Sequence, residues 1–470
     1  MSTAKLFAQQ YSQYNTGTLY DSFENPSQRS FIPDSSRAIA SNFFFPNFSG
    51  NFYVTGNAQN ALTSRLSWGY YNTGALEIGN KKYSNIRSNS SLYLGMLKIF
   101  TSLNGNQELG FSISNHTETR GYATDESIAL FNGSTNFNKD VYADIFNSRF
   151  SYQVYNQFSL SYREQINPRL ALGVKVSALL GMAYREVNIV QSGVVFDRPN
   201  DAATLSMRGT ARASDTLSLF SLKNPGVAIS IGAGVTGRQG FRFQYNLKNL
   251  GVIHWGGEAY HSDFNNPGTV IPGITTAKRE DNIIDSVQSI TSTNKTGKRF
   301  YSKTNALAEF SVNKTYWIDY DHKFKLSPTL IVSKELFYDG ISGAAVVPFG
   351  YNSYTATLTT SYHTMGIFNF GGQFMYKTPN VEFFIGTEKL LPTARAARMA
   401  VTSPNVPQRQ TTGVAHNYSG ADFFIGASFK FGNVIEHAMN ASFIPDGSEK
   451  GFFGRMWDKI FKGEKKDKNY

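Results

Sequence analysis

The sequence predicts an all-β protein: a transmembrane, antiparallel, up-and-down β-barrel of about fourteen strands (twelve to sixteen), with short periplasmic turns and long extracellular loops. Three observations carry this prediction. Apolar and polar residues alternate with period two over runs of about ten residues or more, longer than most soluble strands. Aromatic residues make up 14% of the 470 residues, with 38 Phe and 26 Tyr, while charged residues make up only 17%. No apolar run approaches the roughly 18 residues that a membrane helix needs.

The clearest predicted hairpin lies in residues 158–176, FSLSYREQINPRLALGVKV. In each of its two runs, every second residue is apolar: Phe158, Leu160 and Tyr162, then Leu170, Leu172, Val174 and Val176. The residues that alternate with them are small or polar: Ser159, Ser161 and Arg163, then Gly173 and Lys175. Because neighbouring side chains on a strand point to opposite faces, each run has one apolar and one polar face. Asn167 and Pro168 between the runs favour a short turn.

The same alternation recurs along the chain, and its length separates two architectures. It is found in residues 225–235, 241–248, 368–376 and 422–431. A soluble β-sandwich also has one apolar face per strand, but it uses short strands with turns every 8–12 residues or so, that is, about one per strand. Long strands joined alternately by short turns and long polar segments are typical of a barrel whose apolar face meets lipid. The barrel is therefore the favoured architecture.

We expect three regions along the chain. Residues 1–36 form an N-terminal periplasmic segment, residues 37–432 form the barrel, and residues 433–470 form a periplasmic, basic, amphipathic tail. Residues 1–9 resemble the end of a signal peptide, where a small residue precedes polar mature sequence. An ordinary cytosolic N-terminus is the alternative.

The long polar segments between strands are the predicted extracellular loops. They lie near residues 121–147, 187–224, 256–299 and 390–419, and they are rich in Asn, Thr, Ser and Asp. Within the third loop, residues 280–292 read EDNIIDSVQSITS. The apolar residues of this stretch fall on one helical face, so we expect a short loop helix there.

Two tryptophans are predicted anchors at the membrane interface. Trp255 follows His254 at the end of a strand, where its ring would lie at the boundary between lipid and water. Trp457 lies in the tail, within an apolar helical stripe made of Phe452, Phe453, Met456, Trp457, Ile460 and Phe461. Basic residues back this stripe, so the helix is suited to an anionic membrane surface. Packing against the barrel mouth or a partner is the alternative.

Several segments, taken in order, resemble a known group of proteins. They are LYDSFENPSQ at residues 19–28, DESIALFNGSTNF at 125–137, EQINPRLALGVKV at 164–176, NPGVAISIGAGV at 224–235 and FQYNLKNLGVIHW at 243–255. Together they resemble a Bacteroidetes family of uncharacterised outer-membrane β-barrels, distantly similar to PorP/SprF-type barrels and to fatty-acid-transporter (FadL-like) barrels. The resemblance implies an outer-membrane barrel with both termini in the periplasm. It implies no activity, cofactor or binding residue, and it does not extend to the basic tail.

No residue pattern indicates an enzyme, a cofactor or a metal site. The seven His residues are scattered without metal-ligand spacing, and no nucleophile elbow or phosphate loop is present. Asp319, Asp321 and His322 form the densest acid–His group, but they lie beside a predicted turn, which favours a solvated turn over a catalytic site. The net charge of +11 is spread thinly, which argues against nucleic-acid binding.

Five basic residues alternate with apolar residues and so lie on the polar face of the predicted strands: Arg163, Lys175, Arg242, Lys248 and Lys430. We expect these side chains to face the barrel lumen. They could attract anions, or they could pair with lumen acids such as Glu108 and Asp422.

The sequence therefore predicts a protein of the bacterial outer membrane that is not an enzyme. Its expected partners are membrane lipid and other envelope proteins. The favoured role is a structural or assembly component of an envelope complex. Porin-like or transporter-like passage of a small or hydrophobic molecule is the alternative, and a hydrolase at the barrel rim is a minor one.

Overall fold

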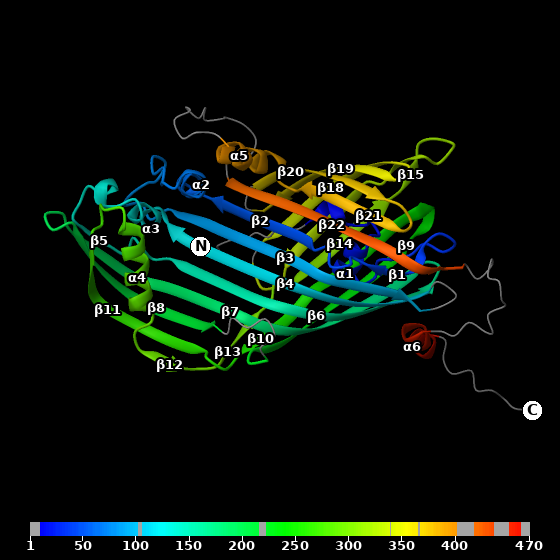
Figure 1. The fold of residues 1–470 in the computed structure, drawn as a ribbon, viewed down its shortest axis with the longest axis horizontal. Helices are drawn as coiled ribbons and strands as arrows, with labels where there is room; N and C mark the ends of the chain where they lie inside the picture. Colours follow the sequence, from blue (N-terminus) through cyan, green and yellow to red (C-terminus); the bar gives the residue numbers. More distant parts are fainter. Residues whose placement is uncertain are drawn as a thin grey trace, which may run out of the picture.

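The predicted barrel is present and closed. The computed structural model describes residues 10–101, 106–215, 222–338, 340–364, 367–401, 418–436 and 451–461. Within these residues, one antiparallel sheet closes into a barrel of fourteen strands (Figure 1). The last strand, β22 (Tyr418–Val434), is hydrogen-bonded to the first, which consists of β1 (Arg37–Ser41) and β2 (Asn47–Thr55). The fold class predicted from the sequence is confirmed.

Several wall strands consist of two or three consecutive segments. After β1 and β2, the wall continues with β3 (Tyr83–Phe100), β4 (Gln107–Thr124), β6 (Arg149–Asn167), β7 (Leu170–Asp197), β8 (Ala202–Asp215) with β9 (Pro225–Thr236), β10 (Phe241–Trp255) with β11 (Tyr260–Pro272), β12 (Lys295–Gly297) with β13 (Phe300–Lys303) and β14 (Leu307–Lys314), β17 (Thr329–Glu335), β18 (Ile341–Tyr351), β19 (Tyr354–His363), β20 (Ile367–Lys377), β21 (Val381–Thr387) and β22. The short strands beside it are β5 (Val141–Ala143), β15 (Tyr316–Trp317) and β16 (Phe324–Leu326). The wall is uneven in height, because β7 has 28 residues and β17 has 7.

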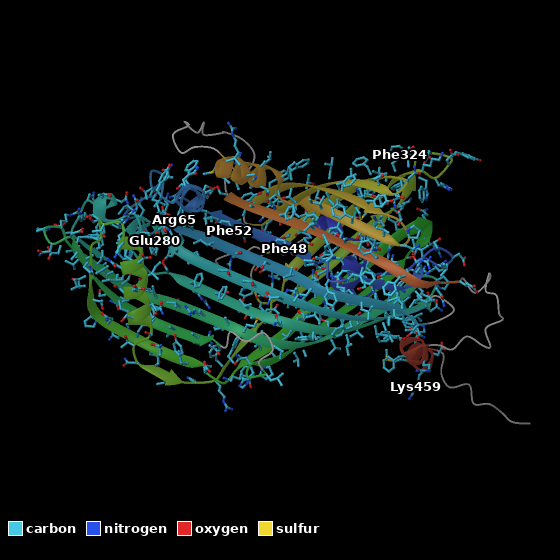
Figure 2. All side chains as sticks on the ribbon, viewed as in Figure 1. Phe48, Phe52, Arg65, Glu280, Phe324 and Lys459 are labelled. Carbon is cyan, nitrogen blue, oxygen red and sulfur yellow. The ribbon has the colours of Figure 1, made fainter. Side chains whose placement is uncertain are left out.

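The two faces of the wall differ as the alternation predicts. In β6, Leu160 is 67% exposed on the outer surface, whereas the next residue, Ser161, is 4% exposed and faces inward. Phe48 on β2 is an exposed aromatic residue (Figure 2). A barrel with aliphatic and aromatic side chains outside and polar ones inside is suited to lipid around it.

One end of the barrel carries short turns. Between β6 and β7, the side-chain Oδ1 of Asn167 accepts the backbone N–H groups of Arg169 (2.9 Å) and Leu170 (3.0 Å). An Asn side chain that replaces a backbone acceptor in this way stabilises a tight turn. The turn predicted at Asn167 and Pro168 is confirmed.

The opposite end carries longer connections with helices. They are α2 (Gln59–Trp68), α3 (Asp125–Leu130), α4 (Arg279–Thr291) and α5 (Leu390–Val401). Helix α4 confirms the loop helix predicted over residues 280–292. An ion pair joins two of these connections: Arg65 Nη2 of α2 lies 2.8 Å from Glu280 Oε2 of α4 (Figure 2).

The prediction of a loop over residues 187–224 is wrong for most of that range. Strand β7 continues to Asp197, and β8 returns from Ala202 after a tight turn. Side chains of this extension, such as Val194 and Leu205, are buried in an apolar cluster with Ile283 of α4. The strands therefore extend beyond the rest of the wall because they have an apolar core of their own.

The N-terminal segment lies inside the barrel, which differs from the predicted periplasmic position of residues 1–36. Residues 10–36, which we call the plug, contain the 3₁₀ turn η1 (Tyr11–Gln13) and helix α1 (Leu19–Glu24). Leu19, Phe23 and Phe31 are fully buried in a cluster with wall side chains of β3, β20, β21 and β22. In the periplasm these apolar side chains would meet water, and burial inside the barrel is favourable.

Helix α6 (Phe452–Phe461), in the predicted tail, lies at the end of the barrel opposite α2 and α4 (Figures 1 and 2). The carboxylate of Glu164, near the end of β6, accepts the backbone N–H groups of Phe453 and Gly454, both at 2.8 Å. The ring of Phe453 also contacts that of Tyr162. The helix therefore packs against the barrel rim. Among the described residues, no helix is long and apolar enough to cross a membrane.

Candidate functional site

The plug folds into a helix followed by a tight turn. Thr18 Oγ1 accepts the backbone N–H of Asp21 (3.2 Å), which caps α1. After the helix, Asn25 Oδ1 accepts both the N–H (3.1 Å) and the hydroxyl (2.8 Å) of Ser27. Pro26 between them cannot continue a helix. The segment LYDSFENPSQ thus encodes a helix and a turn.

Two wall glycines make room for this turn. A Cβ added to Gly173 of β7 would lie 2.0 Å from the carbonyl oxygen of Pro26, and one added to Gly232 of β9 would lie 2.4 Å from Asn25 Oδ1. Gly173 and Gly232 are direct neighbours in the sheet. The absence of side chains at both positions lets the plug backbone approach the wall closely.

Four buried carboxylates hold the plug by accepting its hydrogen bonds. Glu388 accepts the N–H (2.8 Å) and hydroxyl (2.5 Å) of Ser12, Glu309 the hydroxyl of Tyr14, Glu382 the N–H of Leu19 (2.8 Å) and Glu108 the N–H of Ser30 (3.3 Å). Carboxylates that accept hydrogen bonds from N–H and O–H groups form stronger bonds than neutral acceptors do. The plug is therefore fixed along most of its length.

The five predicted lumen-facing basic residues all lie inside the barrel, next to the plug or to an acid that binds it. Lys248 pairs with Glu24, Arg163 Nε donates to Ser27 O (2.9 Å), Arg242 Nη2 donates to Gln28 Oε1 (2.9 Å), Lys430 Nζ pairs with Glu382 Oε1 (2.9 Å), and Lys175 is buried within the electrostatic reach of Glu24. Arg163, Arg242 and Lys248 thus bind the plug directly, and Lys430 binds Glu382, which holds the plug.

Of the two acids predicted as partners of these basic residues, Glu108 lies next to one of them, Arg163, and Asp422 has a different role. Glu108 pairs with Lys98 (3.1 Å) and lies 3.6 Å from Arg163 Nη1. Asp422 instead accepts the backbone N–H of Glu388 (2.6 Å), so it positions the carboxylate that holds the start of the plug.

Burial and charge shift the pKa values of two plug carboxyls in opposite directions. Burial raises the pKa of Asp21 to about 7, although the charges of Arg242 and Lys377 oppose this shift. Burial also acts to raise the pKa of Glu24, but the neighbouring ammonium group of Lys248 outweighs it and lowers the pKa to about 2. Near neutral pH, Glu24 is therefore ionised and Asp21 is partly protonated.

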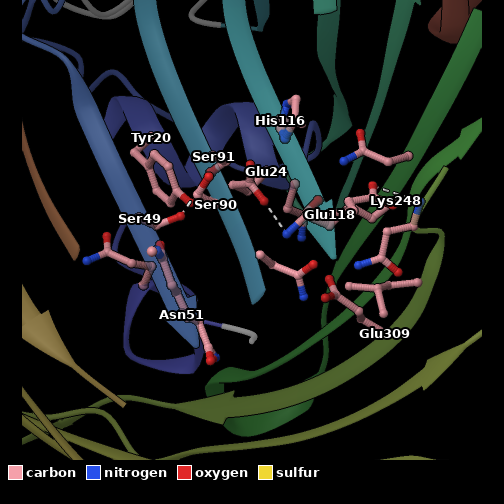
Figure 3. Close-up of a pocket in the computed structure, with 18 of the residues that line it drawn as sticks. Tyr20, Glu24, Ser49, Asn51, Ser90, Ser91, His116, Glu118, Lys248 and Glu309 are labelled. Carbon is pink, nitrogen blue, oxygen red and sulfur yellow. Dashed lines mark hydrogen bonds and ion pairs between the residues drawn. The ribbon is translucent and has the colours of Figure 1, made fainter. Parts of the chain in front are cut away.

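A small cavity of about 120 Å³, which we call the lower cavity, lies beside the plug and is lined mainly by polar residues. Figure 3 shows its lining, with Tyr20 and Glu24 from the plug and His116, Glu118 and Lys248 from the wall. The cavity is lined by groups that hydrogen-bond to water or to a polar solute.

A second, larger cavity of about 420 Å³ adjoins the first, and Glu118 lines both. Its charged lining consists of Arg87, Arg120, Arg149, Arg212, Lys303, Glu118 and Glu186. The side chains of Arg149 and Arg212 are 55% and 36% exposed, so this upper cavity opens to solvent. The sequence interpretation named none of these residues. Glu118 and Arg120 are two positions apart on β4, a spacing that places both on one face of a strand.

Trp255, a predicted interface anchor, does not face lipid. It is fully buried, its Nε1 donates to Ser302 Oγ (2.8 Å), and its ring packs against Tyr184 and Phe300. The reason is a bulge in β10, where the register shifts and Asn249 has a φ of 49°. A bulge moves every later side chain to the other face of the strand.

Trp457, the other predicted anchor, is half-buried on α6 at the barrel rim. Its role at the membrane interface remains a prediction. The acid–His group also has a structural explanation: Asp319 accepts the backbone N–H groups of Phe324 (2.6 Å) and Lys323 (3.0 Å), which closes the exposed turn of the β15–β16 hairpin. Within the described ranges, no cluster of three His, Cys, Asp or Glu residues could hold a metal ion.

No curated protein matches the sequence. Similar solved structures include the toluene transporter TodX of P. putida (8% identity, 92% of this chain, 96% of that chain, TM-score 0.41) and a FadL homologue of Pseudomonas aeruginosa (10%, 90%, 96%, 0.40). The toluene transporter TbuX of Ralstonia pickettii is a third (9%, 87%, 93%, 0.39). At such low identity, no residue role is carried over to this chain.

One family of proteins matches most of the barrel in sequence. Its profile aligns with residues 33–388, from the end of the plug to the connection after β21. The chain belongs to the Family of unknown function (DUF5723).

Proposed function

We propose that this protein is an outer-membrane passage route for a small polar molecule, with the plug as its gate. The observation that carries the proposal is the pair of polar cavities that meet at Glu118 inside the barrel. A barrel that only holds other proteins together needs no charged, solvent-connected space in its lumen. This favours passage, the alternative role in the sequence interpretation, over a purely structural one.

The character of the lining favours a polar solute over a hydrophobic one. Carboxylates and Tyr side chains line both cavities, Lys248 lines the lower one, and guanidinium groups line the upper one. An apolar solute would strip water from these groups without replacing their hydrogen bonds. Pockets for apolar ligands are lined mainly by apolar side chains.

Passage requires the plug to move, because the plug lies beside the lower cavity and is bonded to the wall. Besides apolar packing such as the cluster around Phe23, its wall contacts are hydrogen bonds and ion pairs. Such bonds can be exchanged for bonds to water, at a net cost of about 1.5–3 kcal/mol each where the acceptor is charged. The plug can therefore be released as a unit without unfolding the wall.

A disulfide between plug and wall tests this gate, since the native chain contains no Cys. A Cβ at Gly234 of β9 would have Ser27 Oγ at 3.7 Å as its nearest neighbour and nothing else within 4 Å. The Ser27→Cys/Gly234→Cys variant can thus be cross-linked on oxidation without displacing other groups.

The measurement is the swelling rate of proteoliposomes in small sugars, with the double variant oxidised or reduced. We expect passage in the reduced form and a several-fold slower rate in the oxidised form, with both single-Cys variants insensitive to oxidant. Equal rates in the two redox states would contradict the gate. No uptake above protein-free liposomes in any form would contradict passage itself.

A role in assembly is the second candidate, and α6 favours it. Phe452 and Met456 are exposed apolar residues on a helix that is fixed to the rim by Glu164, which leaves an apolar surface beside the barrel mouth. Gentle detergent extraction from native membranes tests it: a stoichiometric partner that is lost from a Phe452→Ser/Met456→Ser variant supports assembly, and a lone protein contradicts it.

A further inference from the structure

A row of polar and charged side chains crosses the tall side of the wall at the upper cavity. Neighbours in the sheet are, in order, Arg87 of β3, Arg120 of β4, Ser151 of β6, Glu186 of β7 and Arg212 of β8. All five line the cavity. The row therefore places three guanidinium groups and one carboxylate along one rung of the wall.

At one end of the row the charges are matched. Glu186 accepts hydrogen bonds from Arg212, its direct neighbour, and from Arg149 Nη2 (2.8 Å). Both carboxylate oxygens accept bonds in this cluster: Arg149 donates to Oε1, and Arg212 and Tyr184 (2.7 Å) donate to Oε2. Glu186 is therefore committed to the arginines on its own side.

At the other end, Arg87 and Arg120 stand directly opposite each other on adjacent strands. Like charges in this position destabilise a sheet. Two acids lie nearby, Glu118 and Glu335, and both act electrostatically on Arg120. However, Glu118 already accepts bonds from Tyr155 (2.9 Å) and from other groups.

The cavity as a whole carries excess positive charge. Five cationic side chains and two carboxylates line it, and Glu335 beside it lowers the excess from three charges to two. Cavities lined by one sign of charge raise the local concentration of the opposite ion. The upper cavity is thus electrostatically suited to an anion.

Arg87 shows where that anion would bind. It is 3% exposed and lines the cavity, and its Nε and Nη1 atoms are buried without a hydrogen-bond acceptor among the described residues. A buried guanidinium N–H without an acceptor is costly. A ligand oxygen in the cavity would remove this cost.

Arg120 is held in place beside it. Its guanidinium lies over the ring of Tyr338, 3.4 Å from the ring centroid. This stacking uses the flat face of the group, while its N–H donors lie in the plane, where they match the oxygens of a carboxylate. The ring therefore orients Arg120 for binding an oxyanion.

We infer that Arg87 and Arg120 bind the carboxylate of a small organic anion whose planar body lies in the upper cavity. The ring of Tyr122, which follows Arg120 on the same face of β4 and lines the cavity, supplies a flat surface for that body. Only one part of this inference rests on the proposed function, namely that the bound anion is also the solute that passes through the barrel. The site itself is defined by the arginine pair.

The test is calorimetric titration of the purified full chain in detergent. The probes are benzoate, its neutral isostere benzamide, and inorganic phosphate. We expect benzoate to bind at least tenfold more tightly than benzamide, and more tightly than phosphate, which lacks a planar body. Arg87→Gln and Arg120→Gln should each weaken benzoate binding by roughly tenfold or more, because each removes a charge-assisted hydrogen bond.

Arg149→Gln is the matched control, since Arg149 lines the same cavity but is bonded to Glu186. It should change benzoate affinity by only about twofold. Arg87→Lys, which keeps the charge but not the planar donor set, should lie between wild type and Arg87→Gln. It also keeps the test decisive if Arg87→Gln fails to fold, as judged by the loss of heat-modifiable gel migration.

Several outcomes would overturn the inference: equal affinity for benzoate and benzamide, tighter binding of phosphate, or benzoate binding that neither arginine substitution changes. Swelling assays separate this inference from the proposed function. Benzoate binding that depends on Arg87, without uptake of any solute, leaves the site standing and refutes passage. Solute uptake without benzoate binding refutes the site and leaves passage standing.

Discussion

Glu24 of the plug and Lys248 of β10 form an ion pair inside the barrel, and both side chains are largely shielded from water. The hydroxyl of Tyr93 also donates to Glu24 (2.6 Å), and Lys175 adds a second positive charge nearby. One carboxylate thus balances two ammonium groups in the lumen. Its removal takes away the acid that acts on Lys175 and leaves Lys248 with the weaker effects of Glu309 and Asp21, which is far more costly than the loss of an exposed pair.

Glu24→Gln should therefore weaken plug docking by about 3–5 kcal/mol. The measurement is hydrogen exchange of residues 10–36, read by mass spectrometry on the full chain, in which protection should fall by orders of magnitude while the wall strands stay protected. Glu77→Gln is the matched control, because Glu77 pairs with Lys82 on the exposed surface (2.7 Å). It should leave protection of the plug unchanged, because an exposed ion pair contributes little to stability. Unchanged plug protection in Glu24→Gln would show that the pair does not hold the plug.

Gly173 tests whether the plug needs its close approach to the wall. In Gly173→Ala, the new Cβ would lie 2.0 Å from Pro26 O and 2.6 Å from Ser27 N, and both are backbone atoms that cannot rotate away. We expect docking of the plug to weaken by about 1–3 kcal/mol through overpacking. The readout is protease cleavage within residues 10–36, which should become several-fold faster.

Gly234→Ala provides the control for this steric argument. It is the same substitution on the neighbouring strand, facing the same turn, but its Cβ would meet only Ser27 Oγ at 3.7 Å, an ordinary contact. Cleavage of the plug should stay at the wild-type rate. If both variants behave alike, the tight fit around Pro26 does not position the plug.

The sequence could predict the wall because period-two alternation reports directly which side chains face lipid. The hairpin around Asn167, the fourteen strands and the loop helix near Ile283 all follow from local patterns. Alternation fails where one inserted residue shifts the register. The bulge at Asn249 does so, and it moves Trp255 from the predicted lipid face to the interior.

The site was harder to predict because its parts are far apart in the chain. Arg163, Lys175 and Lys248 were assigned to the lumen from parity alone, but the segment that fills the lumen is short, mixed in polarity and remote from them. Its polar residues look solvated until the wall supplies partners. Likewise, the opposition of Arg87 and Arg120 depends on the register of two strands, which composition does not set.

Asp21 makes plug docking depend on pH. Burial raises its pKa from an ordinary value of 3.8 to about 7 in the docked plug, where Arg242, Lys377 and Glu24 are the charged groups that act on it. A carboxyl whose pKa is raised on docking favours the docked state fully below its ordinary pKa. This contribution is lost as pH rises through the docked value. Docking should therefore weaken by on the order of 4 kcal/mol between pH 4 and pH 7.

Other carboxyls determine the window in which this effect is visible. Burial also raises the pKa of Glu388, to about 8, so it acts in the same direction up to that pH. Glu24 acts oppositely, since its pKa falls from 4.5 to about 2, and its contribution is lost only as the solution becomes more acidic than pH 4.5. Between pH 5 and pH 8, the net effect is a plug that loosens as pH rises.

Asp21→Asn should remove only its own share of this dependence, because an amide cannot ionise whereas Glu388 still titrates. Its oxygen can still accept the N–H of Gly17, which Asp21 Oδ2 accepts at 3.0 Å. The measurement is the swelling rate of proteoliposomes between pH 5 and pH 8. We expect a rate that rises steeply with pH for wild type, and a clearly shallower rise for the variant, in which Glu388 alone provides the dependence. Parallel pH profiles for the two proteins would exclude Asp21 as the titrating group, and a wild-type rate that falls with rising pH would contradict the direction of the linkage.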